Sequence, residues 1–176
     1  MTRVRFAGFG GQGVVLSGFI LGRAACLHAG KNAAMTQNYG PESRGGACNA
    51  DVVVEEGEIS MPVFDQPDLL VILSQEAANK NAKWIPGSKL VLIDEDLVHL
   101  EGDDPKIQKA PFTRTANTLG RRIVANIVML GTLTARSNLV PPAAMEEAIS
   151  HTVPPKTIDL NIKAFRAGLA LPKEEG

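Results

Sequence analysis

Residues 3–13, RVRFAGFGGQG, describe a short strand that breaks into a glycine-rich turn. Charged and apolar residues alternate from Arg3 to Ala7, as they do in a strand with two different faces. From Val14 to Ala29 the apolar residues recur at helical spacing, and Gly30 stands where a helix would stop. The chain therefore opens with a strand, a glycine turn and a helix.

The rest of the chain alternates between strand and helix patterns. Strands are expected over residues 32–37, 47–56, 59–63, 68–74, 89–93 and 107–110, with 47–56 and 59–63 paired as a hairpin, and helices over 75–83, 115–136, 142–151 and 157–169. This alternation predicts a Rossmann-like, three-layer α/β domain with a mainly parallel, partly mixed sheet and a helical C-terminal part. We expect one domain over residues 1–171 and a loose tail over residues 172–176.

Composition narrows the classes of protein that fit. The chain has 176 residues and two cysteines, so neither a disulfide framework nor an iron–sulfur cluster is expected within it. The longest nearly apolar run, Ile123–Leu133, is about half of a membrane-spanning helix, and the first residues do not read as a signal peptide. We expect a soluble, cytoplasmic protein that binds no membrane, and the sequence pI of about 6.3 disfavours nucleic-acid binding.

The net charge of −1 conceals a segregation of charge along the chain. Residues 1–50 carry +4, residues 51–104 carry −10 and residues 105–176 carry +5. Such a distribution suits a chain that meets an anionic ligand or charged partners.

The glycine turn is the first candidate binding site. Gly8, Gly10 and Gly13 match the spacing of the dinucleotide-binding fingerprint, and a helix N-terminus after such a turn favours phosphate groups. The acidic residue expected about 20 positions later to bind a ribose is missing, because no Asp or Glu precedes Glu42. The same glycines could instead serve only to pack the first helix on the sheet.

Residues 39–46, YGPESRGG, form the second candidate site. Arg44 could bind a phosphate or carboxylate group in a bidentate manner, Tyr39 could stack or donate a hydrogen bond, and Gly45 would let the chain pass close to a ligand. The alternative is a surface loop in which Glu42 and Arg44 form a solvated pair. The candidate cofactor-binding residues are Gly8, Gly10, Gly11, Gln12, Gly13, Tyr39, Gly40, Glu42, Arg44 and Gly45.

Other polar residues favour structural interpretations. Cys26 and Cys48 are expected to be small core residues, and the three histidines are too scattered for a metal site. Asn126 interrupts an apolar helix and needs a hydrogen-bond partner, either inside the chain or across a subunit contact. The acidic stretch from Asp94 to Asp104 is expected to be a solvated loop.

The glycine turn, taken together with residues 36–46, TQNYGPESRGG, resembles the gamma subunit of the 2-oxoacid:ferredoxin oxidoreductases. The similarity is greatest to the 2-oxoglutarate type within the pyruvate/ketoisovalerate oxidoreductase family. It continues through residues 51–53, 73–77 and 126–131 and through Asn161, Ala164, Phe165 and Gly168, so it covers nearly the whole chain.

This resemblance implies a subunit that is inactive alone. Enzymes of this family decarboxylate a 2-oxoacid on thiamine diphosphate, which is held through magnesium, and pass electrons through [4Fe-4S] clusters to ferredoxin while the acyl group goes to coenzyme A. Partner subunits of the alpha, beta and delta types would carry those cofactors. This chain would form part of the coenzyme A side of the site, with no catalytic residue of its own.

Two other functions stay open from the residues themselves. An independent NAD(P)-dependent dehydrogenase would need a ribose-binding acid and a pair such as Tyr-x-x-x-Lys, and Ser43 stands four places after the only tyrosine, Tyr39. A noncatalytic nucleotide-binding module would need neither.

Overall fold

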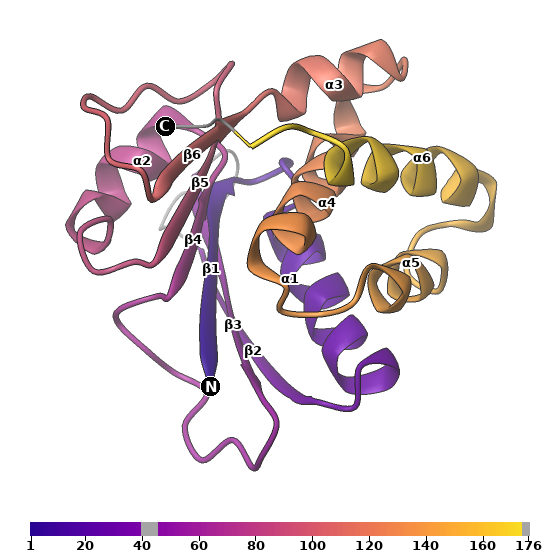
Figure 1. Cartoon of the computed structure of the whole chain (residues 1–176), viewed down its shortest axis with the longest axis horizontal. Helices are drawn as coiled ribbons and strands as arrows, with labels where there is room; N and C mark the ends of the chain where they lie inside the picture. Colours follow the sequence, from indigo (N-terminus) through magenta and orange to yellow (C-terminus); the bar gives the residue numbers. More distant parts are fainter. Residues whose placement is uncertain (40–45, 174–176) are drawn as a thin grey trace.

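The computed structural model of the chain describes residues 1–39 and 46–173 (Figure 1). Residues 174–176 of the expected tail and most of the expected loop after residue 39 lie outside these ranges. The strands are β1 (Thr2–Phe9), β2 (Asn32–Tyr39), β3 (Ala47–Glu55), β4 (Leu69–Ile72), β5 (Leu90–Asp94) and β6 (Ile107–Ala110). The α-helices are α1 (Val14–Arg23), α2 (Gln75–Asn81), α3 (Phe112–Thr118), α4 (Ala125–Ser137), α5 (Pro142–Ser150) and α6 (Ile158–Leu169). Shorter turns are the π-helical η1 (Ala24–His28) and the 3₁₀ turns η2 (Ala82–Trp84), η3 (Arg122–Val124) and η4 (Pro155–Thr157).

The strands form one mixed sheet in the order β2-β3-β1-β4-β5-β6. Strands β1, β4, β5 and β6 run parallel, whereas β3 is antiparallel to both β1 and β2. Helix α2 covers one face of the sheet, and α1, α4, α5 and α6 lie on the other (Figure 1). The α/β fold with a mainly parallel, partly mixed sheet is therefore confirmed.

The central strands β4 and β5 are buried along their whole length. Leu70 and Ile72 of β4 belong to the apolar cluster under α2. Leu69 and Val71 belong to the larger cluster under the opposite helices. A strand covered on both faces needs apolar residues at every position, which is why this segment reads as an unbroken apolar run.

The predicted strand over residues 59–63, and with it the hairpin, is wrong. Both edges of β3 are already paired, with β1 and with β2, so no edge is left for a further strand. Pro62 also lacks a backbone amide to donate, and Met61 and Val63 are exposed. Arg5 holds the end of this segment instead, because its guanidinium donates to the carbonyl oxygens of Phe64 and Asp65.

The predicted helix over residues 115–136 is two helices, α3 and α4. The chain leaves α3 at Gly120, whose φ of 88° lies in the left-handed region, and then enters η3 before α4 begins. The break turns residues 121–126 toward the end of the sheet. Among the described residues no helix has the length and apolar character needed to cross a membrane.

Helices α4 and α6 approach each other at two facing glycines. A Cβ atom placed on Gly131 would lie 2.1 Å from the Phe165 carbonyl oxygen, and one on Gly168 would lie 1.9 Å from the Val128 carbonyl oxygen. Thr132 Oγ1 reinforces this contact by donating to the Gly168 carbonyl oxygen at 3.0 Å. Because the obstructing atoms are backbone, no side-chain rotation can make room for a methyl group.

We predict that Gly168→Ala lowers the free energy of unfolding by about 2–3 kcal/mol, because α6 must move away from α4. Urea denaturation of the two proteins measures the difference. Gly57→Ala is the matched control, since a Cβ atom at Gly57 meets nothing within 4 Å. A Gly168→Ala variant as stable as the Gly57→Ala variant would contradict the contact.

Candidate functional site

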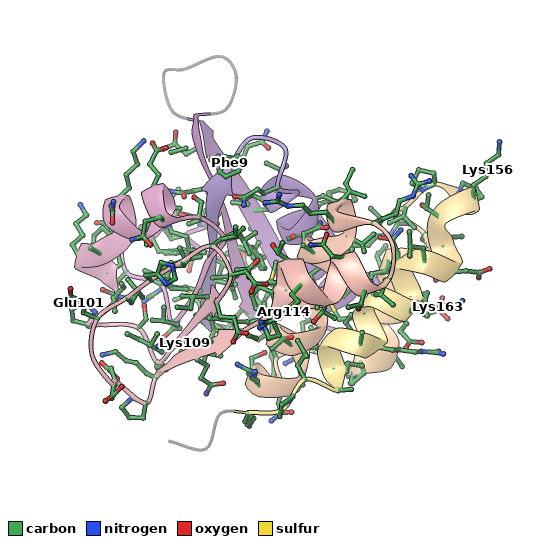
Figure 2. All side chains as sticks on the ribbon, turned by 90° about the horizontal axis from the view of Figure 1, so that it is seen from above. Phe9, Glu101, Lys109, Arg114, Lys156 and Lys163 are labelled. Atoms are coloured by element: carbon green, nitrogen blue, oxygen red, sulfur yellow. The ribbon has the colours of Figure 1, made fainter. Side chains whose placement is uncertain are left out.

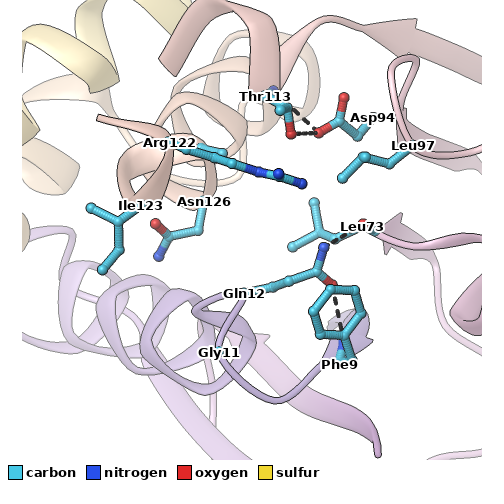
Figure 3. Close-up of a pocket in the computed structure, with 11 residues that line it drawn as sticks. Phe9, Gly11, Gln12, Leu73, Asp94, Leu97, Thr113, Arg122, Ile123 and Asn126 are labelled. Atoms are coloured by element: carbon cyan, nitrogen blue, oxygen red, sulfur yellow. Dashed lines mark hydrogen bonds between the residues drawn. The ribbon is translucent and has the colours of Figure 1, made fainter. Parts of the chain in front are cut away.

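A cavity of about 420 Å³ opens at the carboxyl ends of β1, β4 and β5 (Figure 3). This is the end of an open parallel sheet where ligands commonly bind. The lining residues come from the glycine turn, the ends of β4 and β5, and the segments that begin α3 and α4: Phe9, Gly11, Gln12, Leu73, Asp94, Leu97, Thr113, Arg122, Ile123, Ala125 and Asn126.

Gln12 shapes the glycine turn from within. Its Nε2 donates to the Leu73 carbonyl oxygen at 2.7 Å, and its Oε1 accepts from the Phe9 amide at 3.0 Å. Gly8 lies in β1 directly beneath this side chain, because a Cβ atom there would come within 2.6 Å of Gln12 Oε1. Both residues thus tie the turn to the ends of β1 and β4, whereas Gly11, with a φ of 99° and open space around it, lies on the cavity wall.

Gly13 joins the beginnings of α1 and α4. It is the N-cap of α1 in the left-handed conformation, with a φ of 73°. A Cβ atom at Gly13 would lie 2.4 Å from Asn126 Nδ2, and that nitrogen donates to the Gly13 carbonyl oxygen at 3.4 Å. Asn126 therefore finds its hydrogen-bond partner inside the chain, at the point where the two helices meet.

The two helix N-termini face a common region. A second cavity of about 360 Å³ adjoins the first and is lined by Gly11, Gly13 and Val14 from one helix start and by Ile123 and Asn126 from the other. The first-turn amides of α1 have no intrahelical acceptor, and no side chain caps this helix. Helix α4 continues directly from η3, so its first amide, that of Ala125, donates to the Arg122 carbonyl oxygen. The partial positive charge of both helices is thus directed at one crevice, which favours an anion there.

Arg122 adds a full positive charge to this crevice. Its side chain extends across the cavity between Gln12 and the Asp94–Thr113 pair (Figure 3), and no ion pair to it is formed by the described residues. Sequence reasoning missed Arg122 because it placed the residue inside one long helix. Gly120, two residues earlier, was the available signal, since a glycine commonly ends a helix.

Asp94 is the second residue that sequence reasoning missed. It was expected in a solvated loop, but its side chain is only 1 % exposed because β5 extends through it. Its Oδ2 accepts from the Thr113 hydroxyl at 2.6 Å and from the Thr113 amide at 3.2 Å. Burial raises the pKa of Asp94 above its ordinary value, and these hydrogen bonds offset part of that rise.

The side chains that commonly bind metals are scattered in the part of the chain that the structure describes. No group of three or more His, Cys, Asp or Glu side chains comes together within residues 1–39 and 46–173. Cys48 is buried in β3, whereas Cys26 is exposed on η1, so the prediction that both cysteines are core residues is wrong for Cys26. Cys26 is held at the surface by the Ala33 amide, which donates to its Sγ at 3.1 Å.

The second candidate site, residues 39–46, lies at the same end of the sheet as the glycine turn. Tyr39 is the last residue of β2 and pairs with Cys48 of β3, which itself pairs with Gly8 of β1. The Gly10 amide donates to the Gly46 carbonyl oxygen at 3.2 Å. Gly46 therefore contacts the glycine turn, whereas Tyr39 lies at the same end of the sheet with β3 between it and β1. The predicted site residues Gly40, Glu42, Arg44 and Gly45 lie outside the described residues.

Three comparisons relate the chain to known proteins. Residues 3–171 match the family model described as pyruvate ferredoxin/flavodoxin oxidoreductase. The 2-oxoglutarate synthase subunit KorC of Methanocaldococcus jannaschii is 47% identical over 175 residues, which cover 97% of this chain and 94% of that protein.

Solved structures give the same family. The gamma subunit of the keto/oxoacid ferredoxin oxidoreductase from Geobacter sulfurreducens aligns with a TM-score of 0.82 and 39% identity over 96% of each chain. The 2-oxoglutarate:ferredoxin oxidoreductase of Magnetococcus marinus, solved with 2-oxoglutarate, coenzyme A and succinyl-CoA bound, aligns with a TM-score of 0.83 and 25% identity. That alignment covers 96% of this chain and 30% of the Magnetococcus chain.

The raised pKa of Asp94 predicts how the stability of the protein changes with pH. In the folded protein this pKa lies above its ordinary value of 3.8, so ionisation of the buried carboxyl group costs stability. The cost disappears as the pH is lowered toward 3.8. We expect the wild type to gain stability relative to Asp94→Asn as the pH is lowered from about 7 to about 4. Chemical denaturation at several pH values measures this difference, and a constant difference would contradict the raised pKa.

Proposed function

The chain belongs to the pyruvate ferredoxin/flavodoxin oxidoreductase family, and we propose that it acts as the gamma subunit of a 2-oxoglutarate:ferredoxin oxidoreductase. In the proposed reaction, 2-oxoglutarate loses the carboxylate next to its keto group as CO₂, and the remaining acyl group forms a thioester with coenzyme A. The two electrons released pass to two oxidised ferredoxins. The names of the KorC relative and of the Magnetococcus enzyme support this choice of substrate.

The observation that carries the role of this chain is the crevice between the starts of α1 and α4. Coenzyme A bears a pyrophosphate and a ribose phosphate, which are anionic groups of the kind that helix N-termini and arginines bind. The crevice offers the first-turn amides of α1, the positive end of α4, the cavity wall at Gly11, and the guanidinium of Arg122. This chain would thus bind phosphate groups of coenzyme A and orient them, while Gln12 and Gly8 keep the turn in shape.

The loop after Tyr39 belongs to the same proposal. Gly10, Gly11 and Gly13 would approach the ligand, and Arg44 would contribute a second cation, with Tyr39, Gly40, Glu42 and Gly45 shaping the loop around it. Gly46, which follows the loop, bonds to the Gly10 amide of the glycine turn, and this contact supports the role.

The remaining chemistry would come from companion subunits of the alpha, beta and delta types. Thiamine diphosphate with magnesium supplies the carbanion chemistry of decarboxylation, and [4Fe-4S] clusters carry the electrons toward ferredoxin. The described residues of this chain provide no ligand cluster for either group. We therefore expect no turnover by the isolated chain.

The first test of this function removes the positive charge of Arg122 from the cavity. In the enzyme assembled with its companion subunits, Arg122→Ala should raise the Kd for coenzyme A about tenfold, the effect of losing one charge-assisted hydrogen bond of about 1.5 kcal/mol. The matched control is Arg121→Ala, which removes an exposed neighbouring arginine that does not line the cavity. Calorimetric titration with coenzyme A measures the Kd of both variants. Equal Kd values would show that Arg122 does not bind coenzyme A.

A separate test concerns the loop. Arg44→Ala in the assembled enzyme should also weaken coenzyme A binding, and should do so more strongly at low ionic strength than at high, because exposed charge interactions are screened by salt. Steady-state measurement of the KM for coenzyme A, with ferredoxin reduction as the readout, gives the comparison. An unchanged KM at low ionic strength would show that Arg44 does not contact this substrate.

A further inference from the structure

The outer side of α1 and the neighbouring edge of the sheet form a continuous apolar surface. We define this α1–β2 surface by Leu16 and Phe19 of α1, Leu27 of η1, Met35 of β2, and Ile123 at its end near the crevice. Three hollows of about 360, 590 and 450 Å³ follow one another along it. The first two share Leu16, and the last two share Phe19 and Met35, so the surface is unbroken.

The apolar side chains of this surface are largely uncovered. The exposed fraction is 51% for Phe19, 64% for Leu27 and 76% for Ile123. Single exposed apolar residues are common in proteins, but a contiguous apolar patch usually marks a binding surface. β2 is also an edge strand of the sheet, with no strand paired on its outer side (Figure 1).

The charge on this surface indicates what kind of partner fits it. Arg23 is the one charged residue among those that line the three hollows, and no Asp or Glu of the described residues lines them. Arg23 is partly exposed, and none of the described residues forms an ion pair with it, so its charge can meet a carboxylate of another chain.

This charge pattern disfavours a second copy of the chain. In a symmetric dimer the same patch lies on both subunits, so each Arg23 would meet a surface that carries a cation and no carboxylate. A different polypeptide can supply the missing carboxylate together with apolar side chains. Its contact would also be continuous with the crevice, because the hollow of about 360 Å³ at this end of the surface is the second cavity of the crevice.

We propose that the α1–β2 surface docks a different polypeptide, which packs apolar side chains on Phe19 and Leu27 and places a carboxylate beside the charge of Arg23. The identification of that polypeptide as a companion subunit of the same enzyme rests on the proposed function. Once docked, it forms the outer wall of the crevice next to Ile123. The ligand site is then completed by assembly.

The experiment uses the full chain with its companion subunits. Phe19→Asp and Leu27→Asp should each raise the Kd for the companion subunits at least tenfold while leaving the melting temperature of the isolated chain unchanged. Arg23→Glu should weaken binding to a similar degree, and Arg23→Lys less. The matched control is Met61→Asp, which changes a residue that is 69% exposed on the segment between β3 and β4, and it should bind as the wild type does. Light scattering should show that the isolated wild-type chain is a monomer.

Three outcomes would overturn the docking proposal, and they differ in what they say of the function. If the wild type assembles and the Phe19, Leu27 and Arg23 variants assemble equally well, the docking surface is elsewhere and the proposed function stands. If the isolated chain is a dimer that Phe19→Asp dissociates, the occupant is a second copy. If the wild type binds no companion subunit, the proposed function fails as well.

Discussion

The backbone contact between α4 and α6 is the constraint on which the candidate site depends. Gly131 and Gly168 let the two helices touch without side chains between them, so the axis of α4 is fixed by carbonyl oxygens that cannot rotate away. The start of α4 meets α1 through Asn126 and Gly13, where the same absence of a Cβ atom permits the contact. A helix fixed at its middle and at its start holds Arg122 and Ile123, just before that start, at the carboxyl edge of the sheet. The crevice is therefore a consequence of how α4 packs.

The polarity of the crevice follows from the same packing. Two helix starts and Arg122 place positive charge at its mouth, while Asp94 lies on the opposite wall, buried and hydrogen-bonded to Thr113. Burial raises the pKa of Asp94, and Thr113 holds its Oδ2 toward the start of α3. The carboxyl group thus fixes α3 to β5, on the wall opposite the cation and the helix starts.

The fold could be predicted largely because its strands and helices have strong periodicity. The continuous apolar runs of β4 and β5 and the glycine turn between β1 and α1 need only local rules. The errors occur where tertiary contacts decide. Residues 59–63 have a strand-like composition, but both edges of β3, their expected partner, are already paired. Residues 115–136 have helical periodicity on both sides of Gly120. Those errors hid part of the site. Arg122 enters the cavity only because the chain breaks there, and Asp94 is buried only because β5 continues through it. The glycines, by contrast, could be identified from spacing, although spacing alone does not separate Gly8, which lies beneath the Gln12 side chain, from Gly11, which lines the cavity.

The proximity of the crevice and the α1–β2 surface has a thermodynamic consequence if both are occupied as proposed. Leu16 and Ile123 line both regions, so a docked subunit and a bound ligand would contact the same side chains and the same helix starts. If the docked subunit raises the affinity for the ligand, the ligand raises the affinity for the subunit by the same factor, because coupling between binding sites is reciprocal. Substrate binding and subunit assembly would therefore be coupled in this chain. The assembled enzyme would bind the ligand more tightly than the isolated chain, and the companion subunits would supply the remaining chemistry there.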